Sequence, residues 1–269
     1  MSELGQIKSQ IVDACKRLER RQLVANHDGN ISFKLADGRF LTTPTSFAKA
    51  DVTESDLLIL DSQGNVLEGK HKVFGEIAWH FAIYRVRPDV TCVVHAHPVT
   101  ASGYGLAGRQ IGTPAVPEAI VSLGRQILTT AFLSPLDPSR EQSGGMFDLE
   151  FSRALAESDG CVVPGNGVFT VGQNVLQTYL RLELVEHIAQ QHKIAEQLGT
   201  LKPLPAALVE ELLKKRPASK FNAPEIPTKI SALNMNPLQN PLIANSSSTN
   251  PSYENIKDLV RSELQNILK

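Results

Sequence analysis

The sequence of 269 residues predicts a mixed α/β protein in which neighbouring strands pair antiparallel. Two strand patterns, at 31–35 and 39–42, flank the dipeptide Asp37-Gly38, and a long helical pattern follows at 173–197. Glycine after aspartate supplies the positive φ that a tight hairpin turn needs. The two strands are therefore joined directly and not through a crossover helix.

The first half of the chain carries two helical patterns and several short strands. Apolar residues recur at three- and four-residue steps up to about Arg21, which predicts an amphipathic helix. A second helix over 76–86 ends at Arg87-Pro88, because proline removes a backbone donor. The strands expected in this half lie at 31–35, 39–42, 57–60, 65–67 and 91–94.

The second half adds strands at 161–163 and 168–171 and the long helix at 173–197. The composition changes after about residue 200. Between Pro217 and Pro251 prolines and serines accumulate without apolar periodicity, which indicates a flexible linker. The domains predicted are a catalytic domain at 1–200, a helical extension and flexible linker at 201–251, and an amphipathic docking helix at 252–269.

Composition excludes several classes of protein. Apolar residues make up 42% and charged residues 20%, as in ordinary globular proteins. The 27 basic and 28 acidic side chains nearly cancel, so no field attracts nucleic acid or an anionic membrane. Three cysteines at unrelated spacings support neither a disulfide framework nor a cysteine-rich zinc site. With no signal peptide and no transmembrane stretch in the pattern, we expect a cytoplasmic protein.

A His-x-His pair is the densest chemical signal. His95 and His97 follow the apolar strand at 91–94, and residues two apart in a strand point the same way. Both imidazoles can then meet one divalent transition metal ion. Glu76 lies early in the helix that returns to this strand, so its carboxylate can reach the same point. By spacing alone, ordinary surface or core histidines are as good an interpretation.

Several motifs together resemble one family. The chain is similar to the class II aldolase/adducin family, and within it to the fuculose-phosphate aldolases, across roughly residues 5–197. The matching segments are Asp28-Gly29-Asn30-Ile31-Ser32, Leu41-Thr42-Thr43-Pro44-Thr45, Gly75-Glu76, Tyr84-Arg85-Val86-Arg87-Pro88-Asp89, Val93-Val94-His95-Ala96-His97-Pro98 and Gly165-Asn166-Gly167-Val168.

The resemblance implies a three-layer α/β/α fold with a central, largely antiparallel mixed sheet, and a homotetramer. It implies a lyase of carbohydrate metabolism in which Zn²⁺, or another divalent metal, stabilises an enediolate as a carbon–carbon bond breaks. The implied metal ligands are His95, His97, Glu76 and Asn166, with Glu76 also the catalytic base. The implied substrate contacts are Asn30, Thr45, Ser46 and Gly75.

Two departures from the family pattern concern metal and substrate. The family places a histidine at the position of Asn166, and an amide oxygen binds zinc much less strongly than imidazole. His187, His192 or water could complete the sphere instead. The fuculose-phosphate aldolases also have two serines where this chain has Phe74-Gly75. Two hydroxyl donors are then missing, which favours a different or non-phosphorylated substrate.

Other polar residues keep two interpretations. Asn30 is either a substrate contact or a turn residue tolerating left-handed geometry after Gly29. His80, one helical turn after Glu76, is expected to be a satisfied histidine near the site or on the surface, as is His27. Residues expected to serve in core packing or to lie in water are Tyr84, Glu118, His71, His187 and His192.

The tail at 252–269 resembles the encapsulation peptides that direct enzymes into bacterial microcompartments. Apolar Ile256, Leu259 and Leu264 lie on one helical face, and such a short helix gains its order by docking. The alternative is a tail that packs on its own oligomer. Balanced charge disfavours a membrane-surface helix.

The leading hypothesis is a metal-dependent aldolase-like lyase cleaving a sugar or sugar phosphate, with the microcompartment shell as a partner of its tail. A dehydratase or epimerase on the same scaffold is the second hypothesis. The third is an adducin-like, non-catalytic scaffold in which the metal site has decayed.

Overall fold

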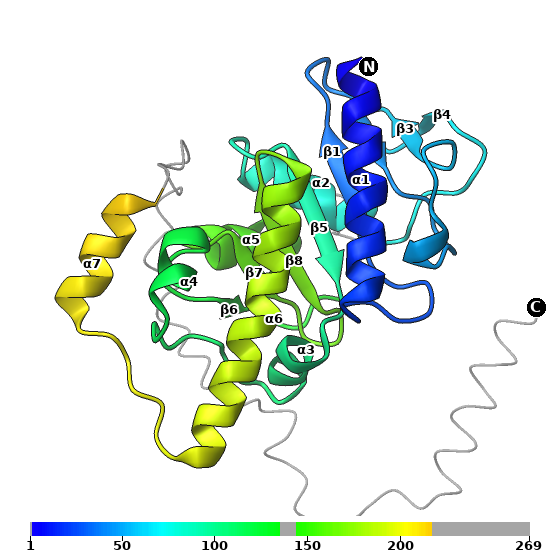
Figure 1. Ribbon diagram of the computed structural model, residues 1–269. Helices are drawn as coiled ribbons and strands as arrows, with labels where there is room; N and C mark the ends of the chain where they lie inside the picture. The colour runs from blue at the N-terminus through cyan, green and yellow to red at the C-terminus, as the bar shows by residue number, and fades with distance from the viewer. Residues whose placement is uncertain (1, 135–143, 217–269) are drawn as a thin grey trace, which may run out of the picture. The chain divides into compact units, whose positions relative to one another are not determined.

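A single mixed sheet organises the part of the chain that the structure describes. The structure is a computed structural model, and it describes residues 2–134 and 144–216, all within one compact unit, Met1–Pro224 (Figure 1). The strand order is β4-β3-β2-β1-β5-β8-β7-β6, with every neighbouring pair antiparallel except β6 and β7. The strands are β1 (Asn30–Lys34), β2 (Phe40–Thr42), β3 (Leu58–Leu60), β4 (Val66–Glu68), β5 (Cys92–Ala96), β6 (Leu128–Thr129), β7 (Gly160–Val162) and β8 (Val168–Gly172).

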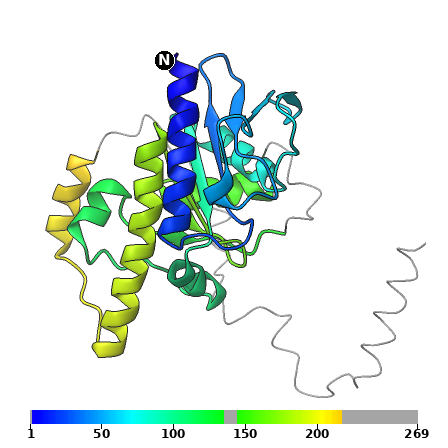
Figure 2. The ribbon, with the colours of Figure 1, turned by 45° about the vertical axis from the view of Figure 1, so that its right-hand side comes forward.

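Helices cover both faces of this sheet, which confirms the three-layer α/β/α prediction. Figures 1 and 2 show α1 and α6 side by side across one face, with α2 and α5 behind the sheet. The helices are α1 (Glu3–Arg20), α2 (Ile77–Val86), α3 (Val99–Leu106), α4 (Pro117–Ser122), α5 (Met146–Leu155), α6 (Val175–Leu198) and α7 (Ala206–Lys215), with a short 3-10 helix at Lys49–Asp51.

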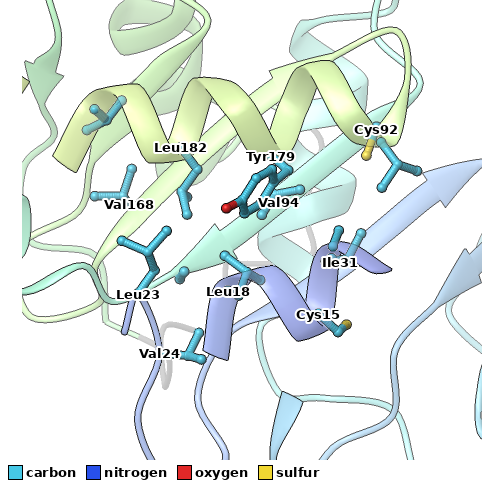
Figure 3. Packing of buried hydrophobic residues seen from close by; sticks show 14 of the residues in the cluster. Cys15, Leu18, Leu23, Val24, Ile31, Cys92, Val94, Val168, Tyr179 and Leu182 are labelled. Carbon is cyan, nitrogen blue, oxygen red and sulfur yellow. The ribbon is translucent and has the colours of Figure 1, made fainter. Parts of the chain in front are cut away.

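Two apolar clusters hold the layers together, one on each side of the sheet. Between the sheet and the α1 and α6 layer, Leu18 and Leu182 meet Val94 of β5 (Figure 3). On the opposite side, Trp79 of α2 packs its ring 5.2 Å from Phe147 of α5, measured between centroids. Burying aromatic side chains of this size contributes much of the stability of a core.

A buried ion cluster fastens the end of α7 to the sheet. The Asp159 carboxylate accepts hydrogen bonds from Arg87 at 2.9 Å, Arg181 at 2.7 Å and Arg216 at 2.8 Å. Arg216 caps the carboxyl end of α7, which also packs against α4. This helical extension therefore belongs to the same compact unit as the sheet.

The expected elements agree with the structure except at a few places. The strand expected at 91–94 continues through His95 to Ala96 as β5, because both β1 and β8 pair with it there. The helices α3, α4 and α5 and the short β6 were not expected. The predicted flexible linker and docking helix lie outside the described residues. Of the predicted helical extension, the structure describes the part up to residue 216, which contains α7. Within the described ranges, no helix is long and apolar enough to cross a membrane.

Candidate functional site

Asn30 is the first residue of β1 and faces the interior. The left-handed backbone belongs to Gly29, with φ of +74°, where an added Cβ would come 3.0 Å from the carbonyl oxygen of His95. Asn30 itself has an ordinary strand backbone and only 3% of its surface is exposed. The turn interpretation of Asn30 is therefore wrong, because Gly29 makes the turn and Asn30 begins the strand.

Glu76 caps the start of α2 and is half-buried. Its Oε2 accepts a hydrogen bond from Nδ2 of Asn30 at 3.4 Å. Phe74, at one of the two positions where the resemblance implied serine, is buried with its ring 5.0 Å from that of His80. An apolar ring therefore lies two residues before Glu76.

The two histidines of the His-x-His pair lie next to each other at the end of β5. Their ring centroids are 4.9 Å apart. His95 is fully buried, pairs with Asn30 on β1, and stacks on Phe169 of β8 with centroids 4.2 Å apart. His97 is half-buried. The strand places the pair and the Asn30–Glu76 contact at one end of the sheet.

The tautomer of His95 follows from its contacts. Its Nε2–H donates to the backbone carbonyl of Asn166 at 2.8 Å, so Nδ1 carries the free lone pair. That Nδ1 is buried and has no hydrogen-bond partner, and neither has Nδ2 of Asn166. Burial, with His97 adding a smaller effect, holds the pKa of His95 well below its usual value. The imidazole is therefore neutral, as a metal ligand must be.

These two imidazoles fit a divalent metal in type but do not complete a site. A neutral ring with a bare, buried nitrogen is a suitable ligand. Within residues 2–134 and 144–216, however, no three His, Cys, Asp or Glu side chains are placed to hold one ion together. The pair therefore fits an ion that takes its other ligands from amide oxygen, water or substrate.

A buried lysine, Lys49, lies close to the same place. Its ammonium donates to the carbonyl oxygens of Phe47 at 2.8 Å and His27 at 3.3 Å, which tie together the loops on either side of the site. Burial lowers its pKa, and Glu76 is among the acidic groups that oppose this effect. Lys49 and Glu76 therefore lie close enough to interact electrostatically.

The remaining expected substrate contacts lie in two adjacent loops. The backbone N–H of Thr45 donates to the carbonyl of Lys72 at 3.0 Å, which joins the loop of Thr45 and Ser46 to the segment leading to Glu76. Ser46 is exposed and has a positive φ of 63°. Gly75 is exposed beside Glu76. The two loops therefore lie side by side, and the side chain of Ser46 is exposed on their surface.

Five other titratable residues that the sequence raised can now be placed. His27 and Glu118 are exposed, and His71 is half-buried with its Nε2 3.1 Å from Asp56. His187 is exposed on α6, as expected. His192 is not in water as expected, since only 2% of it is exposed, because α6 turns this residue toward the core.

Three residues of the site were missed or given no role by sequence reasoning. Ser32 lay inside a quoted motif, Phe169 lay in an expected strand, and Lys49 was not considered. The periodicity of two in a strand could have placed Ser32 on the same face as Asn30. Nothing in the sequence marks Phe169 as the partner of His95, since only strand register brings them together.

Comparison with known sequences identifies the family. The family described as Class II Aldolase and Adducin N-terminal domain matches residues 9–192. The L-fuculose phosphate aldolase of Methanocaldococcus jannaschii is 26% identical over 68% of this chain and 93% of its own length. The enzyme of that name from Escherichia coli O6:H1 is 28% identical over 78% of this chain and 92% of its own length.

Solved structures share the fold. An L-fuculose 1-phosphate aldolase superposes with a TM-score of 0.69 and 21% identity, over 80% of this chain and 97% of its own. An Escherichia coli protein for which aldolase, epimerase and decarboxylase activities are the candidates gives a TM-score of 0.67 and 21% identity, over 79% and 100%. With the family match spanning most of the sheet and the site, the chain belongs to the class II aldolase and adducin N-terminal domain family.

Proposed function

We propose that this protein is a metal-dependent, aldolase-type lyase that cleaves a sugar or sugar phosphate. The observation that carries the proposal is the Glu76 carboxylate, held by Asn30 at the same end of the sheet as the adjacent imidazoles of His95 and His97. A carboxylate beside a metal-binding pair is what carbon–carbon cleavage next to a carbonyl requires.

In this proposal each residue has a separate task. Glu76 takes the proton of the hydroxyl that becomes the aldehyde oxygen, and returns it to the carbon left behind. Asn30 keeps the carboxylate in place, and Lys49 places a positive charge in its surroundings. His95 and His97 hold the metal, which supplies positive charge beside the substrate carbonyl when bound. The half-buried position of Glu76 limits the access of water to the proton it carries.

The activity can be tested with L-fuculose 1-phosphate and with the same sugar lacking phosphate. Aldehyde release, followed by coupled reduction with NADH, reports cleavage. Glu76→Gln should lower kcat by roughly 100-fold or more, because general acid–base catalysis contributes at least about that much. A Glu76→Gln protein that is folded and as active as the parent would contradict the assignment.

The metal is tested separately by chelator competition. His95→Ala and His97→Ala should each abolish zinc binding, while His187→Ala, which removes an exposed histidine on α6, should leave it unchanged. Asn166→His should raise zinc affinity, since imidazole is a better ligand than an amide. Unchanged affinity in Asn166→His would mean that this side chain does not face the ion. A folded parent protein without metal would favour the non-catalytic scaffold.

An epimerase or dehydratase is the second candidate. The observation that favours it is Phe74, buried where a hydroxyl donor for phosphate is expected, because a substrate other than a phosphorylated ketose leaves room for another reaction on the same scaffold. An enzyme of this kind would exchange the substrate's α-proton for deuterium in D₂O without releasing aldehyde. Proton NMR of the same two sugars therefore separates the candidates.

Assembly and location complete the proposal. A homotetramer fits the apolar side chains of Leu176 and Leu180, which α6 leaves 47% and 48% exposed. Light scattering coupled to size-exclusion chromatography measures the mass directly. Residues 252–269 are proposed to bind a microcompartment shell. Fused to an unrelated protein, they should carry it to the shell, and loss of the tetramer on their deletion would instead show that they pack on the oligomer.

A further inference from the structure

A chain of hydrogen bonds leads from the core to the Glu76 carboxylate. The Tyr84 hydroxyl lies 2.8 Å from Oγ of Ser32, which lies 2.7 Å from Nδ1 of His80. Nε2 of His80 lies 2.6 Å from Oδ1 of Asn30, whose Nδ2 reaches Glu76 at 3.4 Å. Five polar groups are thus connected in one line.

The chemistry of the end group fixes the direction of every bond. An ionised carboxylate only accepts, so Asn30 must turn its NH₂ group toward Glu76 and its oxygen toward His80. Nε2 of His80 must then be the donor to that oxygen, and Nδ1 accepts from the hydroxyl of Ser32. The Ser32 hydroxyl has then used its only hydrogen, so the Tyr84 hydroxyl can only donate to Ser32, and it shares its single hydrogen between Oγ at 2.8 Å and the backbone carbonyl at 2.9 Å.

The surroundings of His80 keep it in this one form. It is completely buried, with the ring of Phe74 centred 5.0 Å away and that of Phe169 5.8 Å away. Burial lowers the pKa of His80 to about 3, so it stays neutral at physiological pH. A neutral imidazole carries one N–H, and here both ring nitrogens are engaged.

Helix α2 devotes one stripe of its surface to this line of contacts. Glu76, His80 and Tyr84 are spaced by four residues and therefore lie along one side of the helix. The other buried residues of α2 are apolar: Ala78, Trp79, Ala82 and Ile83. A stripe built only for packing would be apolar as well, because apolar groups of the same shape can replace a buried hydrogen-bonded pair at little cost in stability.

We propose that His80 is a positioning residue for Glu76, acting through the amide of Asn30. By donating from Nε2 to Oδ1, His80 prevents the amide from turning its oxygen toward the carboxylate, where it would repel the negative charge. The catalytic importance of this arrangement rests on the proposed function, whereas the orientation of the amide does not.

Two amide substitutions at this position form a matched pair. In His80→Gln the side-chain nitrogen reaches the place of Nε2 and retains the donor, whereas in His80→Asn the shorter side chain ends near Nδ1 and loses it. His80→Asn should lower kcat about tenfold or more, the equivalent of one hydrogen bond, with KM changed less than about twofold. His80→Gln should stay within about threefold of the parent in both constants.

The orientation itself is read independently by NMR of the full chain labelled with ¹⁵N-asparagine. The Asn30 side-chain amide signal, assigned by its loss in Asn30→Asp, should keep its shift in His80→Gln and move in His80→Asn. An unmoved signal in His80→Asn would overturn the inference. A moved signal with unchanged kcat would support the positioning of the amide and count against Glu76 as the base.

Folding of both variants is checked by circular dichroism and thermal unfolding. If His80→Asn does not fold, Ser32→Ala takes its place, because it removes the partner of Nδ1 and frees the ring to turn. A shifted Asn30 amide and a reduced kcat in Ser32→Ala would support the inference. Parent-like values of both would overturn it.

Discussion

Alanine at position 167 should destabilise the protein by a predictable amount. Gly167 has φ of +74°, and a Cβ there would lie 2.3 Å from the carbonyl oxygen of Ala96 at the end of β5. Left-handed geometry costs an L-residue about 1–2 kcal/mol. Alanine also restricts the unfolded chain more than glycine does, which offsets about 0.4–1 kcal/mol of this cost. Crowding of a well-packed interior adds about 1–3 kcal/mol. We expect a total loss of about 2–4 kcal/mol.

Gly38 offers a matched control for this substitution. Its φ is +86°, but an added Cβ would meet nothing within 4 Å. Gly38→Ala therefore carries the backbone strain without the crowding, and should cost about 1 kcal/mol or less. Comparing the two variants separates the contribution of the close contact with Ala96 from that of the dihedral angle.

Urea denaturation followed by circular dichroism measures both losses. With unchanged slopes, the midpoint of Gly167→Ala should fall by roughly 1 M or more, and that of Gly38→Ala by well under 1 M. Equal losses in the two variants would refute the reasoning, because they would show that the turn before β8 does not pack tightly on β5.

Three further perturbations test other parts of the structure. Burial lowers the pKa of His80 from 6.5 in the unfolded chain to about 3 in the folded protein. The stability that the neutral ring contributes is therefore complete above pH 6.5. Below that, the free energy of unfolding falls by about 1.4 kcal/mol per pH unit as the pH approaches 3. Urea denaturation at pH 7 and pH 5 should show a smaller difference in His80→Gln than in the parent. Asp159→Asn should lower the unfolding free energy by about 3–5 kcal/mol, because it removes the carboxylate from a buried ion cluster. In the same denaturation assay Asp13→Asn, which breaks an exposed ion pair with Arg17, should lower it by under about 0.5 kcal/mol. Trp79→Ala should lower the unfolding free energy by about 3–5 kcal/mol. Phe132→Ala should lower it by little, because 69% of the surface of Phe132 is exposed. Equal losses in the two variants would contradict the packing of α2 on α5.

Local signals in the sequence predicted most of the elements around the site. The hairpin at Asp37-Gly38, the helix stop at Pro88 and the periodicity of α6 each depend on neighbouring residues alone. The helix α5 also carried such a signal, since Phe147, Phe151 and Leu155 repeat every four residues. It was not expected, although Ser143-Gly144-Gly145 directly before it is a turn signal that could have marked its start.

The placement of the predicted site residues depends partly on local pattern and partly on distant contacts. Asn30 pairs with His95 in the sheet and donates to Glu76, so the strand and the helix bring these predicted residues to one end of the sheet. The bond from His95 to the carbonyl of Asn166 could not be foreseen, because it depends on the conformation of a turn 71 residues away. The inward face of His192 likewise depends on how α6 rotates against the sheet.

The contacts of the site join residues that are far apart in the sequence. During synthesis, each contact can form only after its later residue has been made. Asn30 and Glu76 are 46 residues apart, and His95 reaches the Asn166 carbonyl across 71 residues. At about 5–20 residues per second, the ribosome needs roughly 7–30 s to pass from Asn30 to Asn166. Until β5 is made, β1 is an edge strand of its hairpin with β2, and its backbone N–H and C=O groups on that side are unpaired. The nascent first half is therefore a suitable client for chaperones that shield unpaired strands.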